Sequence, residues 1–153
     1  MHGFLKNQSF ERERSLMSPL AASRTYLLPW PPSVNKALTV SRGRKVLSPK
    51  TRKWQNLAAE ELSLQKPEPV KSPAWITIVL YPQDKRRFDI DNKVKSVLDA
   101  LVAAKVIEDD CCRDLMSIVV NLGEIVPEAR ALVVVGHHRW GPAQWPSEIP
   151  NTI

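Results

Sequence analysis

The sequence has little cysteine and no long hydrophobic run. Its only two cysteines, Cys111 and Cys112, are adjacent in the chain. A disulfide between neighbouring residues is strained, so the sequence excludes a disulfide-held scaffold and favours a reduced, cytoplasmic protein. The apolar runs fall far short of the ~20 residues that a membrane-spanning helix needs. Residues 1–22 contain no hydrophobic signal-peptide core, so we expect no membrane association.

The sequence also lacks a glycine-rich phosphate-binding loop, and only 5 of its 153 residues are glycine. Such loops commonly cradle nucleotide phosphates. Their absence speaks against one class of enzyme, a metal-dependent phosphohydrolase acting on a free nucleotide. We likewise expect no small-molecule cofactor.

Acidic residues are missing from one stretch of the chain. Every charged residue between positions 35 and 53 is basic, in a chain with a formal net charge of +6 and a pI of about 9.5. A clustered positive charge favours an anionic partner such as nucleic acid. We therefore predict that Arg42, Arg44 and Lys45 contact phosphates without reading bases. A solvated hairpin tip is the alternative interpretation.

The length fits one domain with its own core. We expect a disordered leader over residues 1–22, a folded domain over 23–138 and a tail containing proline and tryptophan over 139–153. The tail shows no hydrophobic periodicity, and the charged, serine-containing leader has the composition of a disordered segment.

Hydrophobic periodicity predicts a mixed α/β (α+β) domain, with two main helices packed on one mixed β-sheet. Ser48 and Pro49 have the pattern of a helix N-cap followed by N1, and that helix should extend to Leu64. Its buried face should consist of Trp54, Leu57, Ala58 and Leu62. A second helix is expected over 92–105, a hairpin around Gly43, and strands over 25–28, 45–47, 75–81, 115–121 and 131–137.

The most informative stretch is residues 86–95, which place two carboxylates inside a basic run. Side chains alternate faces along an extended segment. Asp89 and Asp91 should therefore converge on one side, while Ile90 turns into the core. The alternative for Asp91 or Asn92 is an ordinary helix N-cap.

The helix that follows should return the chain to a third carboxylate. Its apolar stripe, with the spacing i, i+3, i+4 and i+7, places one face on the core. Beyond it lie Asp109 and Asp110, either of which is a candidate to join Asp89 and Asp91. Carboxylate oxygens suit a hard divalent cation beside a phosphate backbone. A further arrangement, thiol ligation by Cys111 and Cys112 with His137 and His138, is a minor alternative.

One turn beyond Asp91, Lys95 should face the same point as the carboxylates. Surrounded by carboxylates, this lysine should stay protonated and act electrostatically. Asp99, four residues later, should hold it in position, although a simple surface ion pair explains the same spacing.

The run Arg-Phe-Asp-Ile-Asp-Asn-x-x-Lys-x-x-x-Asp-Ala-Leu, followed by Ile-Glu-Asp-Asp, resembles the signature of the RusA-type Holliday junction resolvases. Residues 28–35, Leu-Pro-Trp-Pro-Pro-Ser-Val-Asn, resemble the opening strand and loop of that family, and residues 42–48 resemble its next element. The resemblance extends over about residues 25–136 and leaves both ends of the chain uncovered.

The resemblance implies an active site, and the basic charge of the chain adds an expected DNA surface. The expected catalytic residues are Asp89, Asp91, Lys95 and Asp110, with the three aspartates holding Mg²⁺, or alternatively Mn²⁺. The choice between Asp109 and Asp110 stays open at this point. The expected DNA-binding residues are Asn35, Lys36, Arg42, Arg44, Lys45, Arg86, Arg87 and Lys93.

The resemblance also implies a reaction. The expected protein is a homodimer that resolves four-way junction DNA by two symmetric nicks, in recombination and repair. It would act at the nucleoid or in a phage-infected cell, and a prophage origin is plausible. A branched-DNA-binding protein without cleavage, and a metal-dependent nuclease acting on flaps or single strands, are the alternatives.

Overall fold

The computed structural model describes residues 23–138. The predicted leader over 1–22 and the predicted tail over 139–153 lie outside the described residues, so these domain boundaries stay predictions. In the described part, no helix combines the length and the hydropathy that crossing a bilayer requires.

A four-stranded mixed sheet forms the base of the domain, in the order β1-β6-β4-β5. Its strands are β1 (Arg24–Pro29), β4 (Ala74–Tyr81), β5 (Leu115–Leu122) and β6 (Arg130–His137). β5 runs parallel to β4, whereas β6 is antiparallel to both β4 and β1. The alternation along β4 is strict, with every second residue buried. The predicted strands and the predicted mixed sheet are confirmed.

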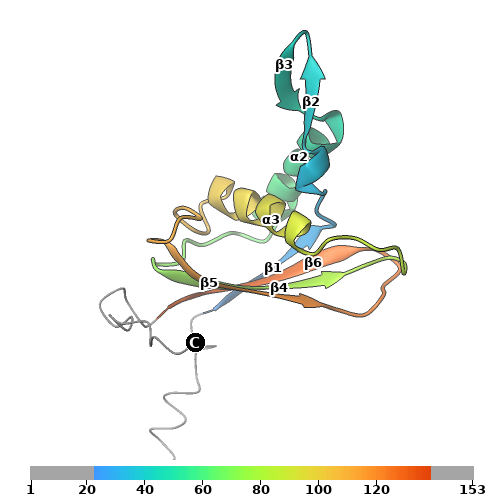
Figure 1. The fold of residues 1–153 in the computed structure, drawn as a ribbon. Helices are drawn as coiled ribbons and strands as arrows, with labels where there is room; N and C mark the ends of the chain where they lie inside the picture. Colours follow the sequence, from blue (N-terminus) through green and yellow to red (C-terminus); the bar gives the residue numbers. More distant parts are fainter. Residues whose placement is uncertain (1–22, 139–153) are drawn as a thin grey trace, which may run out of the picture.

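Two helices cover one face of this sheet, α2 (Pro49–Leu64) and α3 (Asp91–Ala103), as Figure 1 shows. Between them and the sheet lies one core, to which β4 contributes Ile76 and Ile78 and α3 contributes Val97 and Leu101. All four side chains are fully buried. Each such burial stabilises the fold by roughly 1.5–3 kcal/mol. The predicted α+β architecture is therefore confirmed.

A separate two-stranded hairpin, β2 (Leu38–Ser41) and β3 (Arg44–Leu47), precedes α2. It projects beyond the N-terminal end of α2, away from the sheet (Figure 1). Both residues of its turn have positive φ, 49° at Arg42 and 75° at Gly43. Positive φ at both central residues matches the twist of the flanking strands and strongly favours glycine. The hairpin predicted around Gly43 is confirmed.

Helix α2 begins as predicted. Ser48 is its N-cap, and the Ser48 hydroxyl accepts a hydrogen bond from the Thr51 backbone N (3.2 Å), with proline following at N1. Trp54, Ala58 and Leu62 are buried, but the prediction for Leu57 is wrong, since 42% of that residue is exposed. The buried positions of α2 form a stripe with spacings of three and four residues. Leu57 lies on the flank of that stripe and is therefore partly exposed to solvent.

The C-terminal end of α2 is fastened to the edge strand β1 by one side chain. The Gln65 amide nitrogen donates to the carbonyls of Leu27 (2.7 Å) and Glu61 (3.0 Å), and its oxygen accepts from the Leu27 backbone N (2.8 Å). The glutamine therefore satisfies both backbone groups of a residue in a strand that has a sheet neighbour on one side only.

We expect Gln65→Ala to lower the free energy of unfolding by about 1–2 kcal/mol, because backbone groups of β1 and α2 lose a direct partner. The measurement is urea unfolding followed by circular dichroism. Ser63→Ala is the matched control, because it removes a polar side chain from the same helical turn without breaking a cross-link, and it should leave the midpoint almost unchanged. Equal midpoints for the two variants would contradict this role of Gln65.

Candidate active site

Residues 29–32, Pro-Trp-Pro-Pro, form a proline-rich connector at the end of β1, and side chains from both helices hold it in place. Prolines have no N–H and cannot continue a ladder, so their carbonyls need other partners. Trp54 Nε1 donates to the carbonyl of Pro29 (3.2 Å), Lys93 Nζ to that of Pro31 (2.7 Å) and Ser96 Oγ to that of Pro32 (3.2 Å). The connector thereby becomes a rigid wall beside the start of α3.

Lys93 also links this connector to the loop that carries Phe88. The residue is only 7% exposed, and its ammonium lies 5.0 Å from the ring centroid of Trp30 and 5.9 Å from that of Phe88. Burial, followed by the charge of Lys50, lowers the pKa of Lys93 below its ordinary value. The two rings pack edge to face at 5.1 Å. Lys93 thus has a structural role that the sequence did not indicate, and its contact with DNA stays a prediction.

The backbone at the two neighbouring carboxylates differs from the prediction. Ile90 has helical angles (φ −63°, ψ −44°), and α3 begins at Asp91, so residues 89–91 are not an extended segment with alternating faces. Ile90 is 39% exposed rather than turned into the core. The N-cap alternative for Asp91 or Asn92 is also wrong, because Ile90 occupies that position and no side chain caps the helix.

What the structure gives instead is one carboxylate before the helix and one in its first turn. The Asp89 carboxylate accepts a hydrogen bond from the Asn92 amide (3.1 Å). Asp91 is the acidic residue of the first turn of α3, where the helix dipole favours negative charge. Both residues are exposed and so accessible to a ligand.

The third carboxylate is brought to α3 by a lysine. Lys95 Nζ lies 2.6 Å from Asp110 Oδ2 and 2.8 Å from Asp99 Oδ1. Hydrogen bonds to Asp110 and then Asp99 raise the pKa of Lys95 well above its ordinary value, and the Lys95 hydrogen bond is the largest cause of the lowered pKa of Asp110. Lys95 therefore stays protonated at neutral pH and Asp110 stays ionised. The predicted pairing of Lys95 with Asp99 is confirmed.

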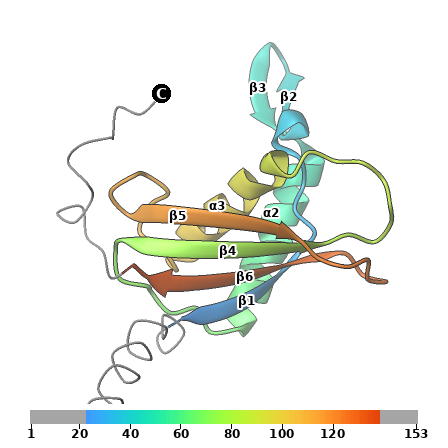
Figure 2. The same cartoon turned by 60° about the horizontal axis from the view of Figure 1, so that its bottom comes forward.

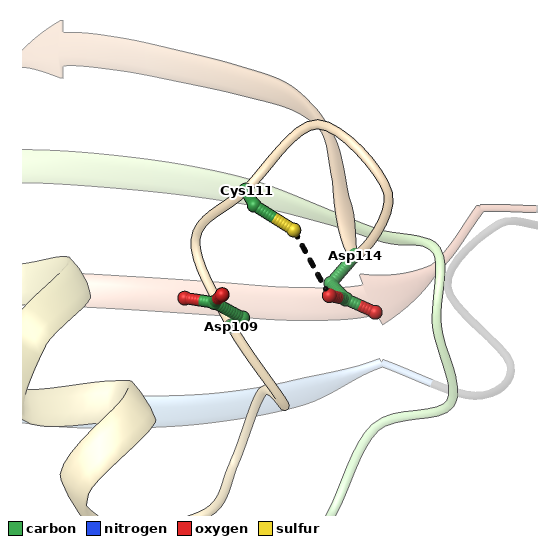
Figure 3. A group of neighbouring side chains, drawn as sticks. All are labelled: Asp109, Cys111 and Asp114. Carbon is green, nitrogen blue, oxygen red and sulfur yellow. Dashed lines mark hydrogen bonds between the residues drawn. The ribbon is translucent and has the colours of Figure 1, made fainter.

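The two adjacent aspartates have different partners. Asp110 bonds to Lys95, whereas Asp109 accepts a hydrogen bond from the Asp110 backbone N (2.7 Å). The Asp109 carboxylate also lies in a group with Cys111 and Asp114, in which one ligand atom from each residue lies within 4.8 Å of the others (Figure 3). The sequence indicated Cys111 as a possible metal ligand but not Asp114, whose only sequence signal is its position three residues after Cys111.

A hydrogen bond explains part of the closeness of this group. The Cys111 thiol donates to the Asp114 carboxylate (3.1 Å) and lowers the pKa of Asp114. Across residues 23–138, this is the one group of three potential metal-ligating side chains that lie so close together. Asp89, Asp91 and Asp110 are not gathered to that degree, so their sharing of one ion stays a prediction.

A cavity of about 420 Å³ opens beside Asp89. Its walls come from residues 30–35, the first turns of α2, the loop that carries Phe88 and the first turn of α3. They include Asn35, Lys50, Phe88 and Lys93. Asn35, which sequence analysis assigned to DNA binding, therefore shares a pocket with one of the predicted catalytic carboxylates.

The remaining predicted DNA-binding residues lie on the hairpin, just before it, and in the loop that precedes α3. Arg42, Arg44 and Lys45 are exposed on the hairpin, and Arg87 is exposed in the loop before Asp89. Arg86 is 91% exposed at its side chain and pairs with Asp84 (3.3 Å). Lys36 lies in the short 3-10 helix η2 (Val34–Lys36) that leads into the hairpin. Their contact with DNA stays a prediction.

Comparison with known proteins gives a family match over most of the described chain. The family model described as Endodeoxyribonuclease RusA matches residues 29–132, which include the connector, the hairpin, both helices and all the carboxylates discussed above. The chain belongs to the RusA family. The family predicted from the sequence, and with it the assignment to the endodeoxyribonucleases, is confirmed.

Curated relatives agree with this family. The chain is 34% identical over 84 residues to the Crossover junction endodeoxyribonuclease RusA of Escherichia coli strain K12 and to that of Escherichia coli O6:H1 strain CFT073. In both cases the match covers 54% of this chain and 70% of the relative.

Proposed function

We propose that this chain is a structure-specific endonuclease that cuts four-way DNA junctions, with Asp89, Asp91, Asp110 and Lys95 as its catalytic residues. The observation that carries the proposal is the Lys95–Asp110 contact (2.6 Å). It joins the first turns of α3 to the segment that follows the helix, and these are the two parts of the motif that the sequence separates. The names of the RusA relatives support a crossover junction as the substrate.

The three aspartates fit a divalent cation such as Mg²⁺, or Mn²⁺, because their donor set consists of carboxylate oxygens alone. Asp110 already has a cationic partner, because the Lys95 ammonium lies 2.6 Å from its Oδ2. When bound, such an ion lowers the pKa of water and neutralises charge on a phosphodiester. Asp89, Asp91 and Asp110 would hold it.

The chain's own residues would orient and stabilise the scissile phosphate. Lys95 is protonated and sits beside Asp110, so it offers hydrogen bonds to a phosphate oxygen where negative charge builds up. Asp99, one helical turn after Lys95, pairs with its ammonium, and the Asn92 amide donates a hydrogen bond to the Asp89 carboxylate. Because Lys95 keeps its proton at neutral pH, its role is electrostatic rather than that of a general base.

A four-way junction must be cut on two opposed strands to give two duplexes. A two-fold homodimer would present two equivalent sites to such a substrate. The basic hairpin and the loop with Arg86 and Arg87 would position the DNA through its phosphates, which fixes register without reading sequence.

The test uses the purified full chain with four substrates: a mobile four-way junction, a flap, a linear duplex and a free nucleotide, each with and without Mg²⁺. We expect paired symmetric nicks in the junction alone, and only with Mg²⁺. Equal cleavage of flap, duplex and junction would instead favour a general nuclease. Junction binding without cleavage under any metal condition would favour a branched-DNA-binding protein.

The hairpin supplies a prediction of its own. We expect Arg44→Gln to weaken binding to junction and duplex alike, and to reduce the slope of log affinity against log salt by about one, because one phosphate contact is lost. The measurement is fluorescence anisotropy over a salt series. Lys71→Gln, in the loop that leads into β4, is the control and should keep the wild-type slope. An unchanged slope for Arg44→Gln would exclude a phosphate contact there.

A further inference from the structure

One face of the β2–β3 hairpin is apolar and uncovered. The register pairs Leu38 with Leu47 and Val40 with Lys45, and directly opposed residues lie on the same face of an antiparallel pair. The exposed fractions are 56% for Leu38, 70% for Val40 and 37% for Leu47. We call these three residues the apolar face of the hairpin.

This arrangement is costly for an isolated chain. A lone two-stranded hairpin is marginally stable in water, and exposed apolar side chains add nothing to its stability. A backbone hydrogen bond from Ser48 N to Ala37 O (2.8 Å) closes the base of the hairpin, beyond which the two strands extend away from the body (Figure 2). An apolar face kept on such an arm indicates a partner that covers it.

The charge around the apolar face defines that partner. Arg42 and Arg44 flank the tip, and Lys45 lies on the same side of the hairpin as Val40. Arg52 and Lys53 add positive charge on the other side, where they line a groove with Thr39 and Val46. The sequence between positions 35 and 53 contains no acid to offset them. A second copy of the chain would bring the same positive hairpin and be repelled. The chemistry that suits both features is a polyanion with accessible flat apolar surfaces, which is DNA at a point where base stacking is broken.

We propose that the apolar face of the hairpin is a wedge that packs against exposed base pairs at the branch point of a junction. The proposal rests on the proposed function and deepens it. In a linear duplex every base pair is covered by its neighbours, whereas a branch point offers end faces on which aliphatic side chains can pack. Proteins that kink DNA use leucine and other apolar side chains in this way. The flanking cations would bind phosphates on either side.

The wedge would make the chain prefer branched DNA to linear duplex, a preference that phosphate contacts alone do not give. The cations of the hairpin would bind any DNA backbone. Apolar contacts with base pairs that are exposed only at a branch point add affinity for branched DNA alone. They would also position the centre of the junction relative to α3 and its carboxylates.

The experiment places 2-aminopurine next to the branch point of a four-way junction, and at the same sequence position in a linear duplex. The full chain is added in EDTA, with the DNA checked for intactness on a gel. We expect a fluorescence change with the junction and none with the duplex. The double variant Leu38→Ser/Val40→Ser should lose that change, bind the junction roughly 10-fold more weakly and keep its affinity for duplex.

Two further variants serve as controls. Leu64→Ser removes a residue that is 77% exposed at the other end of α2, and it should behave as wild type. Leu38→Ile/Val40→Ile keeps an apolar face and should retain the junction signal. Circular dichroism melts of all variants establish that the domain remains folded.

Three results would overturn the wedge. These are an unchanged junction signal in Leu38→Ser/Val40→Ser, an equal loss of affinity for duplex and junction, or a change of oligomeric state by analytical ultracentrifugation, which would make the face a contact between copies. A wild-type chain that gives the branch-point signal but cleaves no substrate with Mg²⁺ would support the wedge while refuting the proposed nuclease function.

Discussion

Asp91→Asn is expected to abolish junction cleavage while leaving junction binding intact. The amide has the shape of the carboxylate but lacks its charge, so a divalent cation loses an anionic ligand. Since such an ion contributes several kcal/mol to stabilising the transition state, the cleavage rate should fall roughly 1000-fold. Initial rates of nicking at saturating Mg²⁺, together with junction affinity from gel shift, measure the two effects separately.

The fold should tolerate this change. Asp91 is exposed in the first turn of α3 and makes no capping hydrogen bond, so the variant loses only a favourable interaction with the helix dipole, about 0.3–1 kcal/mol. Asp84→Asn is the matched control, because Asp84 is an acidic residue of the same basic loop whose partner is Arg86. It should cut nearly as fast as wild type. Comparable nicking rates for the Asp84 and Asp91 variants would remove Asp91 from the active site.

Local sequence signals were enough to predict most of the elements. The Ser48–Pro49 pair predicted the start of α2, Gly43 predicted the hairpin turn, and the alternation along residues 75–81 predicted β4. Each of these signals depends on the backbone preferences of one or two residues or on a period within a single element. Such signals survive whatever the rest of the chain does.

The failures concern places where neighbours in space decide. The Asp-Ile-Asp run has the period of a strand, but Ile90 already has helical angles, so its side chains follow the geometry of a helix start rather than alternating. Leu57 has helical spacing but lies beyond the narrow stripe that packs on the core. In both cases the residue spacing matches the expected pattern, but the secondary structure or the burial of the residue depends on parts of the chain outside that pattern.

Lys93 shows most clearly what a sequence pattern misses. In a run of basic residues it has the signature of a DNA contact, yet its ammonium lies under Trp30 and Phe88 and binds the carbonyl of Pro31. The acceptor of that hydrogen bond is a proline carbonyl 62 positions earlier in the chain. The residues around Lys93 in the sequence do not indicate that this carbonyl needs a partner. The Lys95–Asp110 pair, by contrast, was predictable because family resemblance identified both residues together.

Lys95→Met is expected to lower cleavage by roughly 100-fold or more, since a charged hydrogen-bond donor to the developing phosphate charge is removed. The loss should appear in kcat. Half-exposed ion pairs such as those of Lys95 with Asp99 and Asp110 contribute about 0–1 kcal/mol to stability, so the free energy of unfolding should change far less than the activity. This difference separates a catalytic role from a structural one.

The metal dependence of the same variant gives a sharper test. In the wild-type chain the Lys95 ammonium holds the Asp110 oxygen at 2.6 Å, so a cation binding Asp110 competes with it. Lys95→Met frees that carboxylate, and the Mg²⁺ concentration giving half-maximal cleavage should fall even as kcat falls. Asp99→Asn, which loosens Lys95 without removing it, should lower kcat less. If Lys95→Met raised the Mg²⁺ requirement, Asp110 would not be a metal ligand, and the third carboxylate of the site would have to be sought at Asp109.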